Sequence, residues 1–89
     1  MKKVDLDFEL KDLQDKSVGH AGENVANLLL SEVKGDAVKY FDWAMSFGKK
    51  QPVSMDDSDL VKLKDLLSNT DRMPVIAKAP VIKYLNSLK

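Results

Sequence analysis

Few side chains in this sequence combine in a spacing that could do chemistry. His20 is the only histidine and there is no cysteine, which excludes thiol nucleophiles, disulfides and histidine-rich metal sites. The segment Gly19-His20-Ala21-Gly22 precedes an expected helix, but it lacks the lysine and the third glycine of phosphate-binding loops. We expect His20 to be an exposed loop residue, because Gly19 and Ala21 have no side chain that could orient it as a general base.

Two groups of acidic residues lie close together in the sequence, and neither has the spacing of a catalytic or metal-binding site. Asp5, Asp7 and Glu9 alternate with apolar residues, so they form the polar face of a strand. The cluster at residues 56–59 lacks the alternate oxygen ligands and the sixth-position glycine of a calcium-binding loop, and helix capping explains it. We therefore expect no catalytic residue, no cofactor and no metal, and a chain that is not an enzyme.

Length and composition are those of a small globular domain. The 89 residues, of which 44% are hydrophobic and 31% charged, predict a single domain over residues 1–89 with a modest core. No apolar run is long enough for a signal peptide or a membrane span, so we expect a cytoplasmic protein with no membrane contact. The 14 basic residues balance the 14 acidic ones, which gives no overall charge that would favour nucleic acid.

The first predicted element is a half-buried strand over residues 4–10, where apolar and acidic residues alternate. Two segments could pair with it. A turn at residues 14–15 could return the chain as a short strand at 17–18, although Gln-Asp is not a favoured hairpin pair. Residues 51–55, which also alternate, are the rival partner.

Helical periodicity and capping signals follow the strand. The first helix is predicted over residues 23–34 and ends at Gly35, a residue that tolerates positive φ. Asp36 then caps a second helix, and Asp56 caps a third over residues 57–68.

The last helix contains two prolines, which leave its form open. Pro74 suits the first position of a helix, but Pro80 would remove an interior hydrogen bond. The sequence is compatible with one kinked helix over residues 74–89 or with a turn and a helix that begins near Pro80.

The second helix, over residues 37–47, is apolar around most of its circumference and contains four of the six aromatic residues. Such a helix is typical of a central position, packed on several sides. The predicted fold is therefore mainly α (α+β): about four helices packed around this aromatic helix, with a small N-terminal β-strand or hairpin. If its apolar surface exceeds what so small a core can bury, Tyr40, Trp43 and Phe47 would form an interface with another protein or a second copy. The alternative, that the other helices cover it completely, stays open.

The C-terminal part suggests a second function. From Arg72 onward there is no acidic residue, and the third and fourth helices could form a helix-turn-helix in which Lys78 and Lys83 contact nucleic acid. Pro80 in the recognition helix and the absence of interleaved aromatic residues argue against it. A small DNA-binding regulator is thus the alternative hypothesis.

Three segments carry a resemblance to a known group of proteins. Gly22–Leu29 (GENVANLL), Lys34–Ala44 (KGDAVKYFDWA) and Met55–Lys64 (MDDSDLVKLK) resemble small proteins encoded by tailed phages and prophages, and the likeness extends to Val75–Ala79. It implies a phage or prophage protein that acts in assembly or host takeover by binding other proteins, and it implies no site residues. The leading hypothesis is a non-enzymatic protein-interaction module of this type, for which a homo-oligomer is one form.

Overall fold

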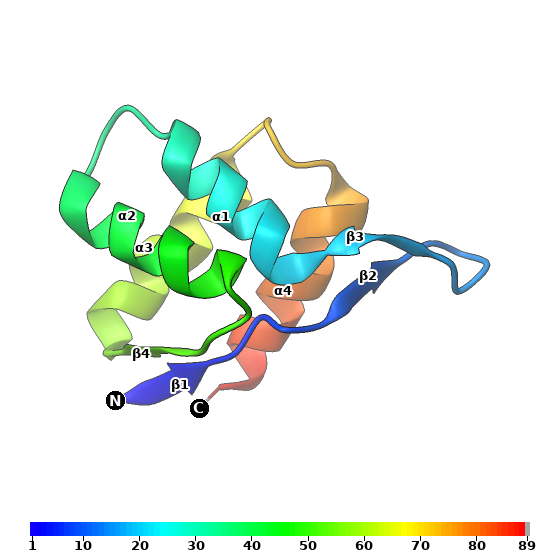
Figure 1. Ribbon diagram of the computed structural model, residues 1–89, viewed down its shortest axis with the longest axis horizontal. Coiled ribbons are helices and arrows are strands. Elements are labelled where there is room, and N and C mark those ends of the chain that lie inside the picture. Colours follow the sequence, from blue (N-terminus) through cyan, green and yellow to red (C-terminus); the bar gives the residue numbers. More distant parts are fainter. Residues whose placement is uncertain (89) are drawn as a thin grey trace.

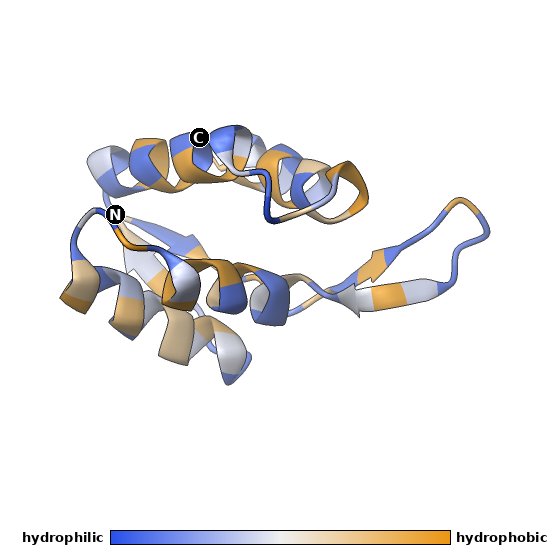
Figure 2. Ribbon diagram, turned by 90° about the horizontal axis from the view of Figure 1, so that it is seen from above, coloured by the Kyte–Doolittle hydropathy of each residue, from blue (hydrophilic) through white to orange (hydrophobic). Residues whose placement is uncertain are grey.

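The structure, a computed structural model, describes residues 1–88 and contains four helices and four short strands (Figure 1). In chain order the elements are β1 (Lys2–Val4), β2 (Glu9–Lys11), β3 (Ser17–His20), α1 (Ala21–Ser31), α2 (Ala37–Gly48), β4 (Val53–Met55), α3 (Asp57–Asn69) and α4 (Val75–Ser87). Helices α1 and α2 form one layer and α3 and α4 a second (Figure 2). The predicted mainly helical α+β class is therefore confirmed.

The core lies between the two helical layers and receives side chains from all the helices and from β1, β2 and β4. Its largest fully buried side chains include Leu6, Leu10, Phe47, Met55, Leu63, Leu67 and Leu85. The apolar positions of the predicted strand, Val4, Leu6 and Leu10, are buried as their alternation indicated.

The N-terminal strand differs from the prediction, because residues 4–10 are not one strand. The chain forms β1 and β2, and each half takes one of the two rival partners: β1 pairs with β4 and β2 with β3, both antiparallel. Between the halves, the Phe8 N–H turns back to the carbonyl of Leu6 at 2.9 Å, and the Asp7 N–H binds the Asp5 carboxylate at 3.0 Å. These local bonds replace the ladder that a continuous strand would have required.

The first helix begins and ends earlier than predicted. It runs from Ala21 to Ser31, so Gly35 does not end it and lies instead in the following loop with a φ of +100°. At the end of the helix, the Arg72 guanidinium donates to the Ser31 carbonyl at 2.9 Å. This contact from the α3–α4 loop satisfies a carbonyl that the predicted glycine cap would have served.

Helix α2 is not the central element that its composition predicted. It buries only Trp43, Ala44 and Phe47, and the opposite side, with Val38 and Phe41, faces solvent. In a two-layer arrangement each helix covers the core with one side, so a helix at the edge of a layer leaves its other side exposed. The prediction of a fold packed around residues 37–47 was wrong in this respect.

The C-terminal helix resolves the alternative that the sequence left open. Helix α4 is one helix from Val75 to Ser87 that contains Pro80, and Pro74 is its N-cap residue. Its buried residues Ala77, Val81 and Leu85 lie at four-residue spacing, as expected for one face packed on the core. Position 89 of the predicted helix lies outside the described residues.

An ion pair joins α2 to α3, which belong to different layers. The Lys39 ammonium on α2 donates to the Asp59 carboxylate on α3 at 2.9 Å, and Asp59 is almost fully buried. That hydrogen bond raises the pKa of Lys39 above its ordinary value of 10.5. Partial burial acts in the opposite direction, and the charges of Asp59, Asp36 and Asp56 add to the increase.

The stability that the Lys39 charge contributes through this pair is expected to disappear in alkaline solution. Because the pKa of Lys39 is higher in the folded chain than in the unfolded one, its contribution is fully present below pH 10.5 and is lost as the pH rises through the folded-state pKa. Urea unfolding of the wild type and of Lys39→Met should therefore differ at neutral pH and converge above pH 10.5. The exposed Lys62, changed to Met, is the control, and a difference that persists unchanged at high pH would contradict the assignment.

Candidate functional site

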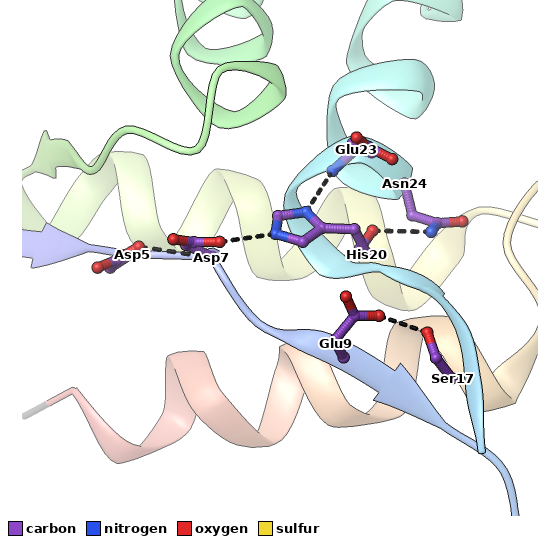
Figure 3. Close-up of polar contacts among 7 residues, drawn as sticks. All are labelled: Asp5, Asp7, Glu9, Ser17, His20, Glu23 and Asn24. Carbon is purple, nitrogen blue, oxygen red and sulfur yellow. Dashed lines mark hydrogen bonds and ion pairs between the residues drawn. The ribbon is translucent and has the colours of Figure 1, made fainter.

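The single histidine is buried, contrary to the expectation of an exposed loop residue. His20 ends β3 and caps α1, with only 8% of its surface exposed. Its Nδ1 accepts the backbone N–H of Glu23 at 3.3 Å, and its Nε2 lies 2.9 Å from the carboxylate of Asp7 (Figure 3). The side chain of Asn24 donates to the His20 carbonyl at 2.9 Å. Partners from outside its immediate neighbours thus orient this ring, which sequence reasoning missed.

The two contacts of the ring determine what His20 can do. A backbone N–H is always a donor, so Nδ1 must present its lone pair to Glu23 and the proton of the neutral ring must lie on Nε2, toward Asp7. Both nitrogens are then engaged within the protein. An Asp–His pair is also a component of catalytic triads, but here the pair joins the β1–β2 connection to the start of α1.

The first three amides of α1 all donate to acceptors within the protein. The N–H groups of Ala21 and Gly22 donate to the carbonyls of Phe8 and Leu6, each at 2.9 Å, and that of Glu23 donates to His20. Helix N-termini bind phosphate when such donors point toward solvent. The Gly19–Gly22 segment is therefore a structural junction, which agrees with its lack of a phosphate-binding motif.

Two of the three predicted interface residues lie in the core and not on the exposed side of the helix. Trp43 and Phe47 lie in the core, with 6% and 1% of their surfaces exposed. Tyr40 is partly buried and its ring lies 5.7 Å from that of Trp43. A partner could reach Trp43 or Phe47 only if α2 left the core.

Exposed apolar side chains collect instead on the far side of the α1–α2 layer. We call this surface the outer face, formed by Leu30, Val33, Val38, Phe41 and Met45. Val38, Phe41 and Met45 follow one another at spacings of three and four along α2, so they share one side of that helix. Leu30 lines one hollow with Val33 and Phe41 and another with Met45, which connects the members of the face.

The two basic residues of the alternative hypothesis do not share a side of α4. Lys78 donates from its ammonium to the Thr70 carbonyl at 2.8 Å, so it holds the α3–α4 loop, whereas Lys83 is exposed. Five positions along a helix correspond to a rotation of about 140°, so one groove of DNA would not meet both. DNA binding through Lys78 and Lys83 stays a prediction.

Over residues 1–88, no group of three or more histidine, cysteine, aspartate or glutamate side chains lies close enough together to hold a metal ion. In the same part of the chain, none of the helices has the length and apolar character needed to cross a bilayer. Comparison of the chain with protein-family models, with curated proteins and with solved structures found no match.

Proposed function

We propose that this chain is a non-enzymatic protein-interaction module and that it binds its partner through the outer face of α1 and α2. The observation that carries the proposal is the exposure of that face: Phe41 is 53% and Leu30 55% exposed although both are large and apolar. Contiguous apolar patches on a small protein mark binding surfaces more often than isolated exposed residues do. On the core side of α2, away from this face, lie the side chains of Tyr40, Trp43 and Phe47.

The resemblance of residues 22–29, 34–44, 55–64 and 75–79 to phage and prophage proteins supports a role in assembly or host takeover in the bacterial cytoplasm. Assembly and host takeover both require binding to other proteins. The outer face is an exposed apolar surface of the kind that binds another protein. An aromatic residue and a methionine lie together on it, and both residue types are enriched in interfaces. The partner is another protein or a second copy of the chain.

Site-specific photo-crosslinking tests this function. p-Benzoylphenylalanine placed at position 41 should capture a partner when the chain is produced in bacterial cells, because Phe41 lies within the outer face. Val61 on α3 is the matched control, since it is 55% exposed but belongs to the other layer. A captured protein from position 41, lost when Met45 is changed to Glu, would support the proposal.

The mass of the adduct identifies the partner as a second copy or as another protein. If position 61 captured as much as position 41, or if neither captured anything, the outer face would not be the binding surface and the proposal would fail.

A further inference from the structure

The cap of α1 is a histidine, and the hydrogen bonds of its ring depend on whether the ring carries an added proton. His20 Nδ1 accepts the Glu23 N–H at 3.3 Å, and Nε2 lies 2.9 Å from the Asp7 carboxylate (Figure 3). Histidine is the side chain whose ordinary titration falls between about pH 5 and 8. The link between α1 and the β1–β2 connection is therefore made by a group that a proton can change.

The two contacts of the ring respond to protonation in opposite ways. A proton from solvent adds to the Nδ1 lone pair, so both ring nitrogens become donors. The new N–H then faces the N–H of Glu23, and two donors cannot share a hydrogen bond. The contact of Nε2–H with Asp7 becomes charge-assisted, and such bonds are roughly twice as strong as neutral ones. The protonated ring is therefore held by Asp7 and rejected by Glu23.

The charged residues on the elements around the ring are mostly acidic. Strand β3 packs on β2 and α1, and the β1–β2 connection passes beside the ring. These elements carry Asp5 and Asp7 in the connection, Glu9 opposite His20 on β2, and Glu23 on α1, which lines a hollow with Lys49 at the end of α2. Among them, the Asp7 carboxylate is the one that contacts a ring nitrogen. The positive end of the α1 dipole lies on the Nδ1 side, so a charged ring is drawn toward Asp7 and away from the helix.

The other hydrogen bonds of the junction do not involve the ring. The N–H groups of Ala21 and Gly22 donate to backbone carbonyls at 2.9 Å, and the Asn24 side chain donates to the His20 carbonyl at 2.9 Å. Backbone carbonyls do not titrate in this range, so these bonds persist when the ring is protonated. The effect of the proton is therefore confined to the amide of Glu23.

From this geometry we infer that His20 is a proton-sensitive cap of α1: the neutral ring binds both Glu23 and Asp7, and the protonated ring keeps Asp7 and releases the Glu23 N–H. Acidification thus loosens the first turn of α1 without opening the junction. Glu23 lines the hollow that Leu30 and Met45 of the outer face also line, so the change occurs beside that face. The inference goes beyond the proposed function and does not depend on it, because it concerns hydrogen bonds within one molecule.

Hydrogen-exchange NMR of the wild type between about pH 8 and about pH 5 tests the inference. The imidazole nitrogen and Cε1–H chemical shifts report the tautomer and the protonation of His20. Protection factors, which correct for the intrinsic pH dependence of exchange, report the state of each amide. As the ring gains its proton, the Glu23 amide should lose protection at least about fivefold relative to the Gly22 amide, the factor that one ordinary hydrogen bond contributes. The Ala21 and Gly22 amides should keep their protection.

Two substitutions of His20 separate its two contacts. In His20→Asn, the side-chain oxygen takes the place of Nδ1 and accepts the Glu23 N–H but does not titrate, so Glu23 should stay protected at both ends of the pH range. In His20→Gln, the longer side chain takes the place of Nε2 and can donate to Asp7, but it has no acceptor for Glu23. The Glu23 amide of this variant should therefore lack protection at every pH. If either variant fails to fold, the ratio of Glu23 to Gly22 protection in the wild type decides alone.

The inference is overturned if the neutral ring carries its proton on Nδ1, if the ring gains no proton before the chain unfolds, or if the Glu23 amide keeps its protection when the ring does gain one. Equal losses at Gly22 and Glu23 would also contradict it, because the whole junction would then open. None of these results concerns the outer face, so the crosslinking experiment tests the proposed function separately.

Discussion

Replacing Phe47 with alanine is expected to reduce the free energy of unfolding by about 3–5 kcal/mol, whereas Phe41→Ala should reduce it by about 1 kcal/mol or less. The two phenylalanines lie on the same helix, but Phe47 is 1% and Phe41 53% exposed. A chain of this length has a total stability of roughly 4–13 kcal/mol. Phe47→Ala thus removes a large part of it and leaves a cavity next to the close contact between α1 and α2.

Urea denaturation in dilute solution measures both variants, and the slope of the transition checks that each still unfolds in two states. Partner binding should respond in the opposite order: Phe41→Ala weakens the contact between molecules, while Phe47→Ala acts only through folding. Equal losses of stability for the two variants would mean that α2 is covered on all sides, as its composition first suggested.

Signals contained in a few consecutive residues predicted much of the helical structure. Asp36 and Asp56 cap α2 and α3 as expected, accepting the N–H groups of Lys39 at 3.1 Å and Asp59 at 2.8 Å. A cap and the helix that it begins are local in the sequence, so their bounds follow from residue types alone. Both observed strand pairs were among the predicted alternatives. Alternation identifies a strand but not its partner, so the sequence left two candidate partners open.

The arrangement of the site depended on contacts between distant residues. His20 is oriented by Asp7, thirteen positions away, and α1 ends where Arg72, forty-one positions from Ser31, meets it. The side that α2 buries was not predictable for a different reason. When apolar residues surround a helix, periodicity no longer indicates the face that meets the core.

Gly22→Ala is expected to destabilise the chain by about 1–3 kcal/mol, even though alanine is the better helix former by about 1 kcal/mol. A Cβ atom at position 22 would lie 2.6 Å from the carbonyl oxygen of Phe47 and 3.2 Å from that of Leu6. Both are backbone atoms, so the start of α1 would have to move away from the end of α2. That movement would also break the bond from the Gly22 N–H to the Leu6 carbonyl.

Gly48→Ala is the matched control, because a Cβ there meets only the Ala26 side chain at 3.7 Å, an ordinary contact. The control should be neutral or gain up to about 1 kcal/mol from reduced backbone freedom in the unfolded chain. Thermal and urea unfolding of the two variants, side by side, separate a steric effect from a general effect of glycine replacement. If Gly22→Ala proved as stable as the control, the ends of α1 and α2 could not lie as close as the structure places them. The hollow between α1 and α2 that Glu23 and Lys49 line would then have a different shape.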